Sequence, residues 1–345
     1  MLAQQEALKP KVWGEYSLYS LTNRNGTQVD ISDLGAIIVN FFTTDKHEQR
    51  RNIVLGYDTP EQYIEGRVFF GCVVGPWANR IANGCYEYQG QIVHLENNEG
   101  DNHLHGASAN IGAKRWAVEQ AFDNRIVLSV AMKAEEAGYP ANIQFKVVYE
   151  LTDSDHLNIE YSAIPDATVP LNMTQHSYFN LGDADNVLDH IAQIHSDKYL
   201  HVDSKAIPRE VRSVAATPLD LRAPVAIGQS IDSDFQQLSM AGGYDHCWCF
   251  DGVDADQPII KNASVTDPDS GLTLSVYSDQ IGMQFYTGNF IENEIGHNGK
   301  VLGKRSGFCL ETQCYPDQVN MSHAATCMYE AGEQYRHRVS YQISK

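Results

Sequence analysis

The segment Ile143-Gln144-Phe145-Lys146-Val147-Val148-Tyr149-Glu150-Leu151 carries the clearest structural signal in the chain. Every odd-numbered position is apolar, and every even-numbered position except Val148 is polar. Because side chains of a β-strand point alternately to its two faces, this period of two predicts a half-buried strand. One face would lie on a core and the other would face polar surroundings.

The same alternation recurs along the chain, in the runs 126–133, 157–163, 272–276 and 339–343. A turn-forming cluster at 123–124 precedes the run 126–133, and another at 152–155 separates 143–151 from 157–163. The three runs therefore predict an antiparallel meander over 126–163.

Helical signals are short. Thr59-Pro60-Glu61-Gln62 and Ser233-Asp234-Phe235-Gln236 have the spacing of a helix-capping box, but no long helical period follows either one. We therefore expect an all-β fold, a large antiparallel β-sandwich with few short helices. We expect it to form a single domain over residues 1–345.

Charge and composition limit the partners. The chain of 345 residues has 25 Lys and Arg against 44 Asp and Glu, a formal net charge of −19. This balance disfavours nucleic acids and anionic membrane surfaces and leaves a neutral substrate open. The N-terminal residues lack the pattern of a secretion signal, and no apolar run is long enough to span a membrane. With seven cysteines and no CxxC pair, we expect a cytoplasmic protein with reduced thiols.

Residues of catalytic type gather in six short segments that are rich in Asn, Gly and His. These segments are 76–84, 97–106, 172–181, 242–248, 284–289 and 307–313. They contain carboxylates, imidazoles, one guanidinium, several amides and many aromatic rings. Carboxylates and amides bind hydroxyl groups, and aromatic rings bind the apolar faces of sugars. The set therefore suits a neutral polyhydroxylated ligand.

Several of these residues have more than one interpretation. Arg80 lies between apolar residues and is either half of a structural ion pair or a fork of donors for a ligand. His103 and His105 would share a face of an extended segment, which suits a metal pair, a donor to a polar ligand, or structural hydrogen bonding. Cys247 and Cys249 suit a metal less well than two buried thiols on one strand face.

The remaining two candidates, His176 and Glu311, are titratable groups. His176 is flanked by Gln, Ser and Tyr, which favours an oriented imidazole for proton transfer as much as a structural one. Glu311 follows an apolar run, so it is either paired or has a raised pKa suited to base catalysis.

Six motifs together resemble those of the aldose 1-epimerase family, also called galactose mutarotases. They stand in family order over most of the chain and are Ala78-Asn79-Arg80-Ile81-Ala82-Asn83-Gly84, Asn102-His103-Leu104-His105-Gly106, Asn172-Met173-Thr174-Gln175-His176-Ser177-Tyr178-Phe179-Asn180-Leu181, Gly243-Tyr244-Asp245-His246, Gln284-Phe285-Tyr286-Thr287-Gly288-Asn289-Phe290 and Cys309-Leu310-Glu311-Thr312-Gln313 with Tyr315-Pro316-Asp317.

The resemblance implies the supersandwich fold of galactose mutarotases, with no metal and no organic cofactor. It implies interconversion of the α and β anomers of free aldohexoses such as D-galactose and D-glucose through ring opening. Glu311 would be the general base at the C1 hydroxyl, and a protonated His176 the general acid at the ring oxygen. The sugar would be held by Arg80, Asn79, His105, Asp245 and Gln284.

Some positions depart from the family pattern, among them Ala107 after His-Gly and Cys314 after Gln313. The acid and base are retained, so these departures bear on sugar preference. Alternatives are a hexose-phosphate 1-epimerase of related fold, a non-catalytic sugar-binding β-domain, and a glycoside hydrolase that uses Asp245 and Glu311 as its carboxylate pair. The oligomeric state is expected to be a monomer or a homodimer.

Overall fold

The computed structural model describes residues 7–251, 258–322 and 324–345. Residues 1–6, part of the segment on which the absence of a secretion signal was judged, lie outside it. Every ladder between its named strands is antiparallel. The all-β prediction is confirmed. Within the described ranges, no helix has the length and apolar character that crossing a bilayer requires.

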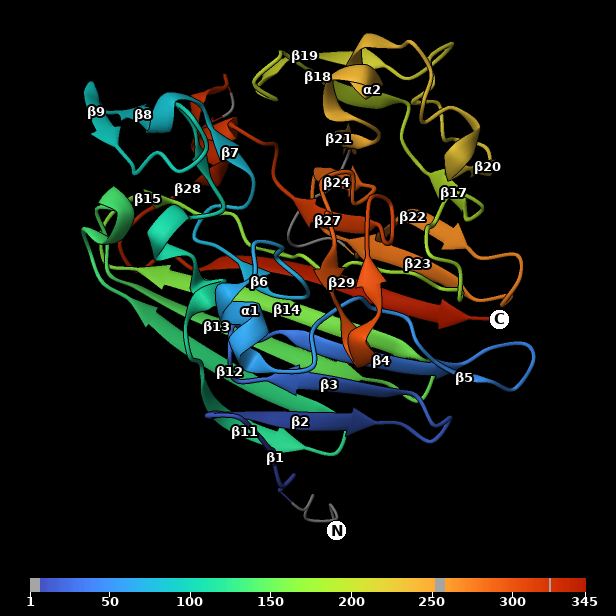
Figure 1. Ribbon diagram of the computed structural model, residues 1–345. Coiled ribbons are helices and arrows are strands. Elements are labelled where there is room, and N and C mark those ends of the chain that lie inside the picture. Colours follow the sequence, from blue (N-terminus) through green and yellow to red (C-terminus); the bar gives the residue numbers. More distant parts are fainter. Residues whose placement is uncertain (1–6, 252–257, 323) are drawn as a thin grey trace.

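A nine-stranded sheet forms the base of the molecule (Figure 1). Its spatial order is β11 (Ala117–Phe122), β12 (Arg125–Met132), β13 (Ile143–Leu151), β14 (His156–Pro165), β29 (Tyr335–Ser344), β23 (Thr273–Ser278), β22 (Ile260–Thr266), β17 (Ile191–Ile194) and β20 (Val225–Ala226). The predicted meander is β12, β13 and β14. In β13 the odd-numbered residues are buried and most even-numbered ones are exposed, as the alternation predicts.

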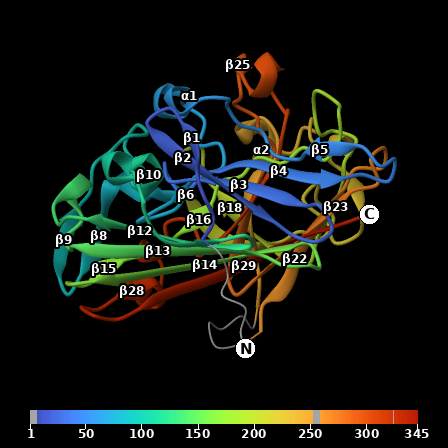
Figure 2. The same ribbon diagram turned by 90° about the horizontal axis from the view of Figure 1, so that it is seen from below.

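Two five-stranded sheets pack against this base. The first runs β1 (Lys11–Trp13), β2 (Tyr16–Thr22), β3 (Gln28–Ser32), β4 (Ile38–Thr44) and β5 (Arg50–Asn52), and Figure 2 shows these blue strands stacked on the long sheet. The second runs β19 (Pro208–Ser213), β18 (Lys198–Val202), β21 (Asp245–Cys249), β24 (Gly282–Tyr286) and β27 (Cys309–Gln313). One hydrophobic cluster includes Phe41, Tyr149 and Phe285, so all three sheets contribute to a common core.

Two-stranded ribbons complete the strand set, and several carry the predicted motifs. They pair β7 (Arg80–Ile81) with β10 (His103–Leu104), β6 (Val73–Val74) with β16 (Thr174–Gln175), β8 (Cys85–Tyr88) with β9 (Gln91–His94), β15 (Val169–Pro170) with β28 (Met328–Tyr329), and β25 (Glu294–Ile295) with β26 (Val301–Leu302). The first two ribbons thus connect segments that are distant in sequence and hold the Arg80, His105 and His176 regions together.

The described chain has two α-helices, each of six residues. Helix α1 (Pro60–Glu65) begins as predicted, and the Gln62 side chain accepts from the backbone N–H of Thr59 at 3.1 Å. The second capping prediction is wrong, because α2 (Gln236–Ala241) begins three residues after Ser233. The Ser233 N–H instead closes a separate turn onto the carbonyl of Ser230. Cys247 and Cys249 are buried in β21, as expected for strand thiols.

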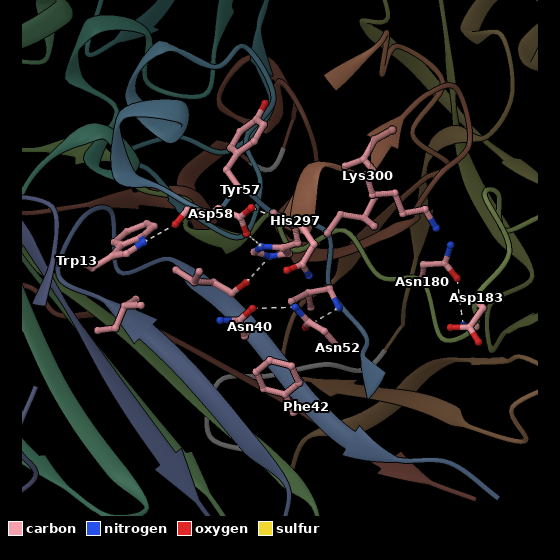
Figure 3. A pocket seen from close by; sticks show the side chains of 18 of the residues that line it. Trp13, Asn40, Phe42, Asn52, Tyr57, Asp58, Asn180, Asp183, His297 and Lys300 are labelled. Carbon is pink, nitrogen blue, oxygen red and sulfur yellow. Dashed lines mark hydrogen bonds and ion pairs between the residues drawn. The ribbon is translucent and has the colours of Figure 1, made fainter. Parts of the chain in front are cut away.

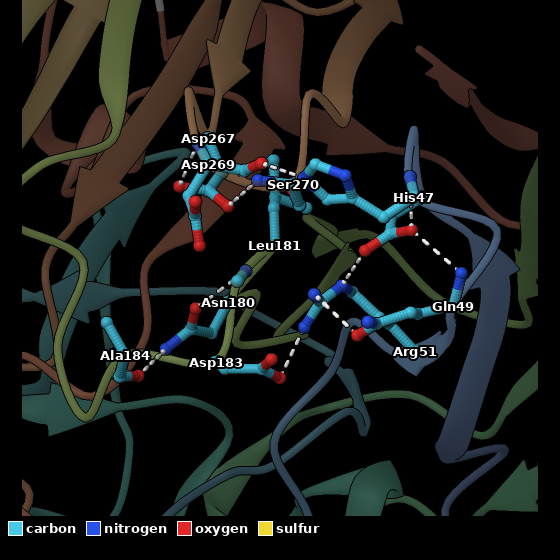
Figure 4. Close-up of polar contacts among 12 residues, drawn as sticks. His47, Gln49, Arg51, Asn180, Leu181, Asp183, Ala184, Asp267, Asp269 and Ser270 are labelled. Atoms are coloured by element: carbon cyan, nitrogen blue, oxygen red, sulfur yellow. Dashed lines mark hydrogen bonds and ion pairs between the residues drawn. The ribbon is translucent and has the colours of Figure 1, made fainter.

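A polar cluster fixes the segment that follows the His176 motif (Figure 4). Arg51 donates from Nε to Asp45 at 2.6 Å and also pairs with Asp183. The Asn180 amide donates to the carbonyls of Ala184 and Ser306, each at 2.9 Å. These bonds tie the chain beyond His176 to the β4–β5 hairpin and to the approach to β27.

Candidate active site

All seven residues predicted for the site line one pocket with a volume of about 220 Å³. These residues are Asn79, Arg80, His105, His176, Asp245, Gln284 and Glu311. They come from six strands or strand ends, β7, β10, β16, β21, β24 and β27, that span more than 230 positions of sequence. The structure therefore brings together what the sequence showed only as separate motifs.

Three neighbouring strands present the acidic and amide side chains. Gln284 of β24 stands directly opposite Glu311 of β27, and Asp245 of β21 stands opposite Tyr286. Since alternate residues of a strand share a face, Asp245, Gln284 and Glu311 point to the same side of the sheet. The Gln284 amide donates to Asp245 at 2.7 Å.

Glu311 and His176 form the centre of the pocket. Glu311 Oε2 lies 3.6 Å from His176 Nε2, and the two side chains are 3% and 6% exposed. Glu311 Oε2 has no hydrogen-bond partner among the described residues, and neither has Gln284 Oε1. Buried polar atoms without partners are costly unless a ligand or water completes them, and these two oxygens, which belong to pocket-lining residues, can accept hydrogen bonds from a polar ligand.

Burial changes the proton affinity of both groups. It raises the pKa of Glu311 well above the ordinary value, with a further upward contribution from the nearby charge of Asp245, while Arg80 acts in the opposite direction. Burial lowers the pKa of His176 to about 4. The expectation of a protonated His176 is therefore wrong for the resting ring, because a charged ring is disfavoured where solvent is excluded. The two shifts favour the neutral forms of both groups, a carboxylic acid beside a neutral imidazole.

Aromatic rings hold the His176 imidazole in place. It stacks on Tyr178, with 5.0 Å between ring centroids and 21° between planes, and on Phe69 at 5.6 Å and 27°. His105 meets it edge-on at 5.3 Å. Tyr178 belongs to a predicted motif, whereas Phe69 comes from a loop that carried no signal in the sequence.

The two histidines of the His103-Leu104-His105 motif diverge. His105 has a left-handed backbone with φ of 52°, so the segment is not extended and the rings do not share a face. His103 bonds instead to the Glu96 carbonyl at 2.6 Å and the Tyr139 hydroxyl at 2.8 Å. The metal-pair interpretation of this motif is therefore wrong.

His105, His176 and Glu311 do place three potential ligand atoms within 4.8 Å of one another. The hydrogen bonding of His105 nevertheless favours a different use. Its Nδ1 accepts the backbone N–H of Asn79 at 3.1 Å, so the neutral ring carries its proton on Nε2. A protonated nitrogen offers no lone pair to a cation, but it can donate to a hydroxyl oxygen.

Arg80 forms the structural ion pair that was one of the two interpretations of its sequence. It binds Glu99 through two bonds, Nε to Oε2 at 2.6 Å and NH2 to Oε1 at 2.5 Å. Its NH1 makes no such bond within the described ranges, so part of the guanidinium remains available. Glu99 lies in the segment 97–106 but was not predicted as a site residue. Only the ribbon of β7 and β10 brings it to Arg80.

A larger cavity lies elsewhere, between β4 and the β25–β26 region (Figure 3). It has a volume of about 520 Å³, but its polar groups bond to one another or to neighbouring residues. His297 bridges Asp58 and the Val39 carbonyl at 3.2 and 3.0 Å, and Asn52 donates to Asn40 at 2.8 Å. With its polar atoms satisfied and no buried carboxylate–imidazole pair, this cavity lacks the chemistry of the smaller pocket.

Comparisons with known proteins identify the family of this chain. The profile described as aldose 1-epimerase matches residues 17–342. Galactose mutarotase of Bos taurus is 37% identical over 321 residues, covering 92% of this chain and 91% of its own. Aldose 1-epimerase of Escherichia coli (strain K12) is 33% identical over 348 residues, covering 99% of each.

Solved structures give the same result for the fold. A GalM/aldose epimerase homologue from C. elegans superposes with a TM-score of 0.86 at 23% identity, covering 95% of this chain and 99% of its own. Galactose 1-epimerase from Lactobacillus acidophilus NCFM gives 0.84 at 26%, covering 98% and 99%. With the profile and the curated relatives, this establishes that the chain belongs to the aldose 1-epimerase family of isomerases.

Proposed function

We propose that this protein is an aldose 1-epimerase that interconverts the α and β anomers of free aldohexoses such as D-galactose and D-glucose. The observation that carries the proposal is the buried Glu311–His176 pair, 3.6 Å apart in a pocket that also presents hydroxyl-binding groups. Named relatives that are mutarotases and aldose 1-epimerases over nearly their full length support it.

Ring opening of a hemiacetal requires one proton to leave O1 and one to reach O5. In the proposed reaction Glu311, as carboxylate, takes the O1 proton, and His176 donates the Nε2 proton to O5 as the C1–O5 bond breaks. The product is the open-chain aldehyde. After rotation about C1–C2, the two groups act in reverse and close the ring with the other configuration.

The pair needs one mobile proton for this cycle. Burial favours that proton on Glu311, and moving it to Nε2 over 3.6 Å produces the reactive form. The charge of Arg80 favours the carboxylate. The low pKa of His176 makes its imidazolium a strong acid, which suits donation to a weakly basic ring oxygen.

Hydroxyl groups of the sugar would be bound by the remaining residues. Asp245 and Gln284 offer oxygens to sugar O–H groups, and His105 and Arg80 offer N–H donors. Asn79 supports His105 through the backbone bond described above. Each of these assignments is a proposal.

The charges of the pocket favour a free sugar over a hexose phosphate. Its lining includes three carboxylates, Glu99, Asp245 and Glu311, and two cations, Arg80 and Arg67. Arg80 is already engaged by Glu99. Even with Glu311 protonated, the two arginines only balance Glu99 and Asp245, so a dianionic phosphate would find no excess of positive charge.

Optical rotation tests the proposal directly. Freshly dissolved α-D-galactose or α-D-glucose should reach its equilibrium rotation faster with the protein than in buffer alone. D-galactose 6-phosphate should be accelerated far less. No acceleration for any free aldose would refute the proposed activity, whereas faster reaction of the phosphate would favour the hexose-phosphate alternative. Acceleration of any aldose would also exclude a non-catalytic sugar-binding domain.

A further inference from the structure

The far side of the His176 ring faces a buried thiol. Cys309 Sγ lies 3.6 Å from His176 Nδ1, which is within hydrogen-bond range for sulfur, and Cys309 is 0% exposed. Cys309 and Glu311 are alternate residues of β27, so their side chains lie on the same face. One imidazole thus contacts two side chains of one strand, Glu311 through Nε2 and Cys309 through Nδ1.

We propose that Cys309 is a positioning residue, whose sulfur accepts the Nδ1–H of His176 and so confines the release and uptake of the mobile proton to Nε2. The inference rests on the proposed function, because it concerns the group assigned as the general acid. It adds a residue whose effect on the reaction runs entirely through His176.

The direction of this hydrogen bond follows from the proton cycle. Nε2 has to release a proton on ring opening and regain it on ring closure. A neutral ring with its hydrogen on Nε2 and a bare Nδ1 could release that hydrogen only by becoming an imidazolate anion. A ring that keeps Nδ1–H alternates instead between neutral imidazole and imidazolium through Nε2, and Nδ1–H needs an acceptor on its side.

Sulfur is suited to this place because it adds no charge. Burial raises the pKa of the Cys309 thiol well above its ordinary value, so the group remains neutral. A carboxylate there would attract positive charge to the ring and weaken it as an acid, in a pocket that already holds Glu99, Asp245 and Glu311. A neutral, weak acceptor orients the ring and leaves the acid strength of its imidazolium high.

The first test uses the wild-type protein. Nitrogen NMR of protein labelled with ¹⁵N-histidine distinguishes protonated from bare ring nitrogens, and His176→Asn identifies the signals by their loss. Near pH 7 we expect a protonated Nδ1 and an Nε2 that is bare or shares the Glu311 proton. A neutral ring with its hydrogen on Nε2 and a bare Nδ1 would overturn the proposal.

The second test removes the acceptor. Cys309→Ala should yield a mixture of tautomers and lower kcat by roughly five- to tenfold, the factor that corresponds to one ordinary hydrogen bond, with KM unchanged. Cys309→Ser keeps an acceptor and should recover part of the tautomer preference and part of kcat. Cys327→Ala, which removes a buried thiol outside the pocket, is the matched control and should leave both unchanged.

Each outcome decides the proposal. If Cys309→Ala lowers kcat while the tautomer stays as in the wild type, the thiol acts by packing and the proposal is wrong. If kcat remains within twofold, it is wrong as well. If Cys309→Ala fails to fold, the wild-type spectrum and Cys309→Ser decide. The NMR result does not depend on turnover, so failure of the proposed function would be seen separately, in the optical rotation.

Discussion

The acid limb of the pH–rate profile should report the burial of His176. Its pKa is lowered to about 4 from the ordinary 6.5, which corresponds to about 3 kcal/mol against the charged ring. The reactive pair holds one proton, and activity is lost when it takes up a second. That second proton binds with the lowered pKa, because it must charge the buried imidazole while Glu311 is already protonated.

The kcat/KM at pH 5.5 distinguishes a histidine of ordinary pKa from one whose pKa is about 4. A histidine with an ordinary pKa would leave about a tenth of kcat/KM at this pH, whereas a pKa of about 4 leaves nearly all of it. The assay is optical rotation of α-D-galactose from pH 5 to 9 with the buffer rate subtracted. Circular dichroism at each pH confirms that the protein is folded. A folded enzyme that keeps a tenth or less of its kcat/KM at pH 5.5 would refute the reasoning.

Three further predictions concern the site and the fold. Glu99→Gln removes the charge that orients Arg80, so KM should rise roughly fivefold with kcat nearly unchanged. Asp101→Asn in the same loop is the control, and a loss confined to kcat would contradict the reasoning. Phe145→Ala should lower the free energy of unfolding, measured in urea, by about 3–5 kcal/mol. The control Gln144→Ala, at an exposed neighbour, should change it by less than about 0.5 kcal/mol. Equal effects would refute the assigned alternation. Stability should fall as the pH drops from about 6.5 toward 4, by about 1 kcal/mol at pH 5.5 for each buried histidine, because the unfolded chain binds protons there that the folded chain does not. Urea unfolding at pH 6.5 and at pH 5.5 measures this loss. Equal stability at the two pH values would contradict the lowered pKa of His176, His190, His246 and His337.

Much of the fold could be predicted because alternation is a local property. The pattern of 143–151 determines which side chains of β13 face the core, and the structure agrees residue by residue. The pairing of β14 with β29, which joins distant parts of the chain, has no comparable local signal. The extent of a single domain over residues 1–345 and the monomer or homodimer state stay predictions.

The site could be predicted as a set of residues but not as a geometry. Motif resemblance identified Glu311 and His176, which the structure places 3.6 Å apart. It could not reveal that Glu99 engages Arg80, because that contact depends on how β7 pairs with β10. The expectations of a protonated His176 and of an extended His103–His105 pair failed for the same reason. Burial and a left-handed backbone at His105 are properties of the folded chain.

The acid–base pair is tested most directly by a double-mutant cycle on mutarotation of α-D-galactose. The rates to compare are those of the wild type, Glu311→Gln, His176→Asn and the double variant, with His195→Asn as a control outside the pocket. Each single change should lower kcat by about 10²- to 10⁴-fold. The double variant should be no slower than the slower single one, because the two groups handle one proton cycle as a unit. Two folded single variants with rates near that of the wild type would contradict the account.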